Sequence, residues 1–163
     1  MGVTTPLGEV LRDQDGVRLQ FVRRHAQPVA AVWATLTDPD LVVQWLGAVS
    51  GDPGSGSVSL AMTEGEGGPP ETVRILVCDP PTRLVVDLSG PDGAWRLSAE
   101  LQDGGEGTTL VFGQRLTEPY DASSIGPGWH YYLDRLGAVV TGSAVPDSWD
   151  DYLSLRDSYA LPG

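Results

Sequence analysis

The sequence predicts an α+β fold in which a curved antiparallel sheet of about six strands wraps around one long helix near the C-terminus. Two patterns carry this prediction. Residues 126–140 repeat apolar side chains with the period of a helix, whereas residues 58–116 alternate apolar and polar side chains with the period of a strand. Because one face of such a sheet is apolar, it needs a cover, and the long helix carries a matching apolar stripe.

The long helix is expected over residues 126–140. Its apolar stripe, which has His130 and Tyr132 on its two shoulders, consists of Trp129, Leu133, Leu136 and Val140. Pro127 suits the first turn, where its missing N–H would have no partner in any case. The opposite face is expected to be solvated, and it holds Tyr131, Asp134, Arg135 and Ala138.

The first third of the chain is expected to form a strand or strand pair and then two short helices. Residues 9–13 and 17–24 flank a Gln-Asp-Gly hairpin signal, so they are read as strands. The helices are expected over residues 28–36 and 38–46, because proline and a capping aspartate stand at their starts. Residues 47–56 are rich in glycine and serine and are expected to be a loop.

The middle of the chain is expected to be an antiparallel meander with turns rich in glycine and proline. Its strands are expected over residues 58–62, 73–77, 84–88, 95–101 and 110–116. A loop over residues 118–125 then leads to the long helix, and a last helix is expected over residues 147–160. The chain is therefore expected to be a single domain over residues 1–163, with its core fold in residues 8–140.

Charge excludes several classes of function. The net charge of −12 at pH 7 and the isoelectric point near 4.3 disfavour binding of nucleic acids and of anionic membranes, because both depend on clustered basic side chains. The 10 basic residues are all arginine, so a Schiff-base lysine and a phosphate-binding Walker lysine are excluded.

Other sequence features bear on location and on metals. The chain has no run of about 18 apolar residues and no basic-then-apolar segment at its start, so we expect a cytoplasmic protein. Cys78 is the single cysteine, and the two histidines are far apart in the sequence. No zinc site, other metal site or cofactor is therefore expected.

Three segments carry a resemblance to a known family. They are residues 32–40 (VWATLTDPD) followed by QWL at 44–46, residues 78–84 (CDPPTRL) and residues 126–136 (GPGWHYYLDRL). In this order they resemble the START-like (SRPBCC) superfamily, and within it bacterial single-domain proteins similar to the C-terminal domain of the activator of heat-shock protein 90 ATPase. The resemblance implies a helix-grip fold, as in START domains and the birch pollen allergen. It also implies a cavity between helix and sheet for apolar or aromatic small molecules.

The residues that match these segments are candidates for the wall of such a cavity: Trp33, Trp45, Trp129, His130 and Leu133. Tyr132, on the same helix, is a further candidate. Trp95 and Phe112 join them from strands whose faces are inferred from alternation alone. For the tryptophans the alternative is ordinary core packing of large rings.

His130 is the candidate for proton transfer. Its imidazole can exchange protons near neutral pH, and Asp134, one turn later, could orient it. The alternative is a histidine at the surface in an i, i+4 pair with no catalytic role. His25 follows two arginines at a strand end and is expected to be solvated.

Three hypotheses of function follow. The first is binding or sequestration of a hydrophobic or aromatic small molecule in the cavity. The second is an enzyme of the cyclase, aromatase or hydrolase kind that uses His130 and Tyr132 in the same cavity. The third is a co-chaperone-like interaction module, as the family name suggests. A homodimer is a possible assembly for any of them.

Overall fold

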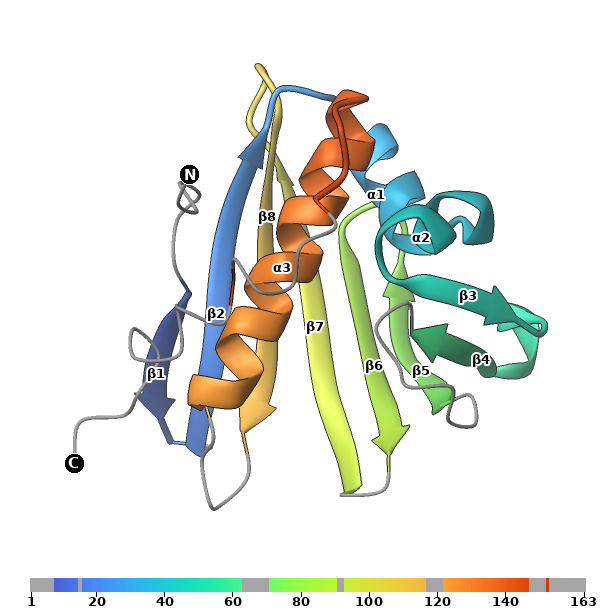
Figure 1. Ribbon diagram of the computed structural model, residues 1–163, viewed down its shortest axis with the longest axis vertical. Coiled ribbons are helices and arrows are strands. Elements are labelled where there is room, and N and C mark those ends of the chain that lie inside the picture. Colours follow the sequence, from blue (N-terminus) through green and yellow to red (C-terminus); the bar gives the residue numbers. More distant parts are fainter. Residues whose placement is uncertain are drawn as a thin grey trace.

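The computed structural model describes residues 8–14, 16–62, 71–90, 93–116, 122–146 and 152. In these residues an antiparallel sheet of eight strands curves around one long helix, α3 (Ala122–Thr141), as Figure 1 shows. The strands are β1 (Glu9–Asp13), β2 (Gly16–His25), β3 (Gly47–Ser50), β4 (Ser57–Met62), β5 (Glu71–Asp79), β6 (Arg83–Gly90), β7 (Gly93–Asp103) and β8 (Thr108–Leu116). The short helices are α1 (Val29–Thr37), α2 (Pro39–Trp45) and the 3-10 turn η1 (Pro53–Ser55). The predicted α+β class is confirmed.

The order of strands in the sheet is β1-β2-β8-β7-β6-β5-β4-β3. From β3 to β8 each strand pairs with the next in the sequence, as a meander requires. The pairing of β2 with β8 is different, because it joins distant parts of the chain and places Phe21 opposite Phe112. The helices α1 and α2 carry the chain from β2 to the far edge of the sheet at β3 (Figure 1).

The prediction of about six strands was too low. Gly47–Ser50 was expected to be a loop, but it forms β3 and pairs with β4 at the edge of the sheet. Four residues are too few for an alternating pattern to stand out from a glycine-rich surrounding. At the other edge, β1 pairs with the first half of β2 in a hairpin that turns at Gly16, whose φ of 125° favours glycine.

The long helix begins earlier than predicted. Residues 122–125, expected to belong to a loop, form its first turn, and Pro127 therefore lies inside the helix instead of at its start. Pro127 is fully buried, although its ring removes one helical N–H donor. The two short helices are confirmed, and Asp38 caps α2 by accepting the backbone N–H of Asp40 at 3.0 Å.

The prediction that one face of α3 is solvated was wrong. Tyr131 is 0% exposed and Arg135 is 8% exposed. The Nε of Arg135 donates to the backbone oxygen of Trp45 at 3.0 Å, and its Nη1 donates to that of Pro146. Because α2 and the chain after α3 both pack on this face, the helix is enclosed on two sides.

The predicted helix over residues 147–160 lies outside the described residues, except for Tyr152. That residue is helical and 5% exposed, and it belongs to the hydrophobic core. The core itself lies between α3 and the concave face of the sheet. Its largest fully buried side chains include Phe21, Leu19, Leu110, Leu133 and Leu136.

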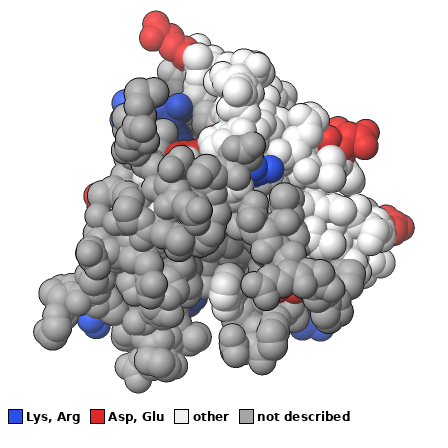
Figure 2. Space-filling view, viewed as in Figure 1, with Lys and Arg blue, Asp and Glu red and all other residues white. Residues whose placement is uncertain are grey.

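On the face of the molecule that Figure 2 shows, the described charges lie at scattered positions. On the face shown in Figure 2, acidic side chains lie apart from one another near the outline of the molecule, and the described arginines form no continuous patch. None of the helices within the described residues is both long and apolar enough to span a membrane.

The packing of α3 predicts the effect of a charge at its centre. Leu133 is 1% exposed, so Leu133→Asp would place an unpaired carboxylate in the core. This costs several kcal/mol against a total stability of roughly 5–15 kcal/mol, and we expect the variant to be unfolded in thermal denaturation. Val43→Asp, at a side chain that is 49% exposed, is the control and should melt close to the wild type. An unchanged melting temperature for Leu133→Asp would show that the stripe does not face the core.

Candidate functional site

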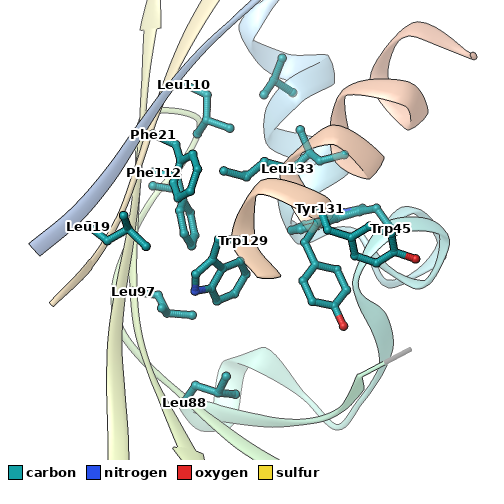
Figure 3. Close-up of a cluster of buried hydrophobic side chains, with 14 of the residues drawn as sticks. Leu19, Phe21, Trp45, Leu88, Leu97, Leu110, Phe112, Trp129, Tyr131 and Leu133 are labelled. Atoms are coloured by element: carbon teal, nitrogen blue, oxygen red, sulfur yellow. The ribbon is translucent and has the colours of Figure 1, made fainter. Parts of the chain in front are cut away.

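The aromatic candidates on α3 and β8 form one buried cluster. The ring centroids of Trp129 and Phe112 are 4.7 Å apart, and those of Trp129 and Tyr132 are 6.0 Å apart. The indole Nε1 of Trp129 donates to Oε1 of Gln114 at 2.5 Å. Figure 3 shows Phe112, Trp129 and Leu133 facing one another between the sheet and the helix. These side chains therefore belong to the buried core between α3 and the sheet, where the sequence predicted the wall of a cavity.

The two tryptophan candidates on the short helices α1 and α2 have contacts that are mainly structural. Trp45 is 3% exposed, and its Nε1 donates to the backbone oxygen of Thr35 at 2.7 Å, which ties α2 to α1. Trp33 is half-buried and packs against the edge of the core. The structure does not bring Trp33 into the cluster around Trp129.

Trp95 lies apart from the other aromatic candidates, on an apolar strip of the concave face. It is 36% exposed and stands opposite Leu88 on β6. Leu88 in turn stands opposite Val73, and Val73 opposite Val58. Residues opposite one another in antiparallel strands share a face, so these four form a row across β7, β6, β5 and β4. Leu88 is buried, but both valines are only half-buried, so the row is incompletely covered.

His130 is buried rather than at the surface. It is 0% exposed, and its ring packs edge-on against Phe21 with centroids 6.1 Å apart. Its Nε2 is 3.7 Å from Oδ2 of Asp134. The hypothesis of a solvated i, i+4 pair is therefore wrong, because Asp134 faces β2 instead of solvent.

Asp134 is the centre of a polar network that the sequence analysis missed. It accepts from Nη1 of Arg23 at 2.6 Å and from the hydroxyl of Tyr152 at 2.7 Å. Arg23 is 6% exposed. The alternation of Leu19 and Phe21 along β2 places Arg23 on the same inner face, and this signal could have identified it.

The environment of His130 lowers its basicity. The pKa of His130 is lowered from 6.5 to about 4, mainly by burial; Asp134 opposes this effect, and the charge of Arg23 adds to it. The imidazole is therefore neutral at neutral pH. A general base works best with a pKa near the working pH, so His130 is poorly suited to that role in this state.

A groove of about 610 Å³ lies on the β2 side of α3. Arg23 and His25 of β2 line one wall, and Leu133 and Gly137 of α3 line the other. Contrary to expectation, His25 is half-buried, and the pKa of its imidazole is lowered by burial and by Arg23.

In the part of the chain that the structure describes, no three His, Cys, Asp or Glu side chains are grouped to hold a metal ion.

The burial of neutral His130 predicts how stability depends on pH. Its pKa is about 4 in the folded protein and returns to 6.5 on unfolding, so the unfolded chain takes up a proton first as pH falls. The contribution is complete above about pH 6.5 and is lost between about pH 6.5 and 4, and it amounts to about 3 kcal/mol. We expect urea denaturation to give a lower free energy of unfolding at pH 5 than at pH 7.

Replacement of each histidine separates their contributions to this effect. His130→Gln should reduce the difference between pH 5 and pH 7, because the group that titrates is gone. His25→Gln is the companion variant, since the pKa of His25 is lowered too and acts in the same direction. A His130→Gln protein with the full wild-type pH dependence would contradict the buried, neutral state of His130.

Comparison with known proteins identifies relatives of this fold. CalU16 from Micromonospora echinospora is 23% identical with a TM-score of 0.74, over 93% of this chain and 95% of that chain. A protein from Bordetella parapertussis is 21% identical with a TM-score of 0.70, over 98% and 93%. DynU16, a protein in the dynemicin biosynthetic locus, is 22% identical with a TM-score of 0.62, over 80% of this chain and 49% of that chain. Curated proteins give no match in sequence.

The structural likenesses show that the chain shares the fold of these proteins. The resemblance to proteins similar to the activator of heat-shock protein 90 ATPase is confirmed by a family model. The family model described as activator of Hsp90 ATPase homolog 1-like protein matches residues 26–141, which is most of the chain. The chain therefore belongs to the family of activator of Hsp90 ATPase homolog 1-like proteins.

Proposed function

We propose that this protein binds a hydrophobic or aromatic small molecule on the concave face of its sheet, beside α3. The observation that carries the proposal is the apolar row of Trp95, Leu88, Val73 and Val58, which defines the apolar strip. Trp95 is 36% exposed, although it lies on the face that forms the core elsewhere. An apolar molecule placed there would remove both the ring and the half-buried valines from water.

The surroundings of the strip also favour a flat apolar ligand. Leu97 lies two residues beyond Trp95 on the same face of β7 and points toward Trp129 in Figure 3, while Leu88 stands opposite Trp95. Ligand sites of this kind combine apolar walls with a few polar groups that fix orientation. Gln114 is the nearby polar side chain of β8, although its oxygen is already engaged by Trp129.

Relatives provide a second line of support. DynU16 is a protein in the dynemicin biosynthetic locus. A role in the handling of a small molecule is consistent with such a setting. The cytoplasm is our proposed location for this activity, and a homodimer is a proposed assembly.

The enzyme hypothesis has less support from the site. It needs His130 and Tyr132 to reach one bound atom, but they pack on different neighbours. The ring of His130 lies against Phe21, and that of Tyr132 lies against Trp129 and Tyr131. The low pKa of His130 is a second argument against a general base there.

The co-chaperone hypothesis needs a broad exposed apolar patch. Among the described residues, the exposed large apolar side chains lie on four different elements: Val22 on β2, Val43 on α2, Leu76 on β5 and Trp95 on β7. Such scattered positions are usual for a soluble surface and give no particular support to a protein partner.

Trp95 is the residue whose replacement tests the proposal. We expect wild-type protein to bind the neutral fluorescent probe N-phenyl-1-naphthylamine at micromolar concentration. Trp95→Ala should weaken this binding by about tenfold, because loss of a ring contact of 1–1.5 kcal/mol corresponds to that factor. Fluorescence titration measures the affinity, and thermal denaturation verifies that the variant is folded.

Two further variants locate the bound probe. Val43→Ala removes an equally exposed apolar side chain from α2 and should leave the affinity unchanged. His130→Gln should change it by less than tenfold, because His130 faces β2 and not the strip. Equal binding by Trp95→Ala and wild type, or no binding of any apolar probe, would contradict the proposal.

A further inference from the structure

The groove on the β2 side of α3 holds an arginine with only part of its hydrogen-bonding capacity used. The side chain of Arg23 is 7% exposed, and its Nη1 donates to Oδ1 of Asp134 at 2.6 Å. Its Nε and Nη2 are buried and have no hydrogen-bond partner among the described residues. Buried N–H groups are almost always paired in folded proteins, so two unpaired ones on a single side chain require an explanation.

These two nitrogens form one edge of the guanidinium group. Their N–H bonds point the same way and match the two oxygens of a carboxylate. The protein contains such a pair at its surface, where Arg96 donates from Nε to Oδ1 of Asp87 and from Nη2 to Oδ2 at 3.1 Å. Arg23 lines the groove, and no carboxylate of the described residues pairs with its Nε and Nη2.

His25 adds a third polar atom to the same wall. It lies two residues after Arg23 on β2, so both side chains are on one face of the sheet. Its Nε2 is buried and has no hydrogen-bond partner in the part of the chain that the structure describes. Because the pKa of His25 is lowered by burial and by Arg23, the ring is neutral, and the tautomer with hydrogen on Nε2 can donate to an anion.

The rest of the groove indicates what kind of anion fits. Its volume of about 610 Å³ is that of a small organic molecule, and apolar side chains of Val22, Leu133, Ala138 and Pro146 contribute to its walls. Asp134 lies in the opposite wall, on α3, and repels any second negative charge. A single negative charge on an apolar body therefore fits better than an inorganic phosphate.

We propose that this groove binds an organic monocarboxylate. Its carboxylate accepts from Nε and Nη2 of Arg23, with His25 beside it, and its apolar body lies against Leu133 and Pro146. The groove and the apolar strip lie on opposite flanks of α3, so this proposal is independent of the one for the concave face.

A pair of matched probes tests the role of the carboxylate. We would titrate wild-type protein with 1-naphthoate, with the neutral 1-naphthamide and with inorganic phosphate, at neutral pH and constant ionic strength. The ¹H–¹⁵N signal of the Arg23 Nε–H reports directly on the proposed contact. We expect naphthoate to shift this signal and to bind at least tenfold more tightly than naphthamide.

Two substitutions in the groove test the position of the ligand. Arg23→Lys keeps a positive charge beside Asp134 but removes the two-nitrogen edge, so naphthoate affinity should fall at least tenfold while naphthamide affinity changes little. Arg96→Lys is the matched control and should bind both probes like the wild type. Gly137→Leu fills the groove and should abolish binding, and a Cβ at Gly137 meets Cε1 of His25 at an ordinary contact of 3.5 Å.

Several results would overturn the proposal. They are equal affinity for naphthoate and naphthamide, wild-type naphthoate binding by Arg23→Lys, and tighter binding of phosphate than of naphthoate, which would indicate a site for inorganic anions. If Arg23→Lys does not fold, Gly137→Leu decides, because its Arg23 is intact. Retained naphthoate binding in that variant would place the ligand elsewhere.

Discussion

A single helix is too narrow to cover a sheet of eight strands, and this constraint determines where the candidate surfaces lie. A helix with its side chains is about 10–12 Å wide. Eight strands at a spacing of about 4.8 Å span roughly 34 Å. In Figure 1, α3 lies over β2, β8 and β7, while α1 and α2 lie nearer the opposite edge. Among the described residues, this cover leaves the apolar strip accessible on one flank of α3 and the groove on the other.

Buried polar contacts fix the position of α3 within this arrangement. Apolar packing is not directional, so the stripe around Leu133 would tolerate small shifts of the helix along the sheet. Asp134 must meet Arg23 of β2, and Arg135 must meet the carbonyl oxygen of Trp45 at the end of α2. Because a buried charge is costly unless it is paired, these contacts define the register of α3 against both layers.

The sequence predicted the helices and strands that have a long periodic pattern of apolar residues. It did not predict burial that depends on contacts with segments distant in the sequence. Alternation located the strands from β4 to β8, but β3 was too short to be recognised. The helical wheel placed Trp129 and Leu133 correctly in the core. It misplaced Tyr131 and Arg135, because it assumes that the polar side of a helix meets water, whereas α2 and Pro146 cover this side. The unpaired edge of Arg23 had no sequence signal, since it depends on which carboxylates reach it in space.

The contacts of β2 with β8 and α3, which lie far from it in the sequence, have a consequence for how the protein folds. Arg23 and Asp134 are separated by 111 positions, so the contact between β2 and α3 joins parts of the chain that are synthesised far apart in time. The hairpins from β3 to β8 connect neighbouring segments and can form early, because short loops lose little entropy on closure. The first strands must then wait for the last strand and α3 before their apolar face is covered. We therefore expect closure of this long loop to be a slow step in folding that needs most of the chain to have been synthesised.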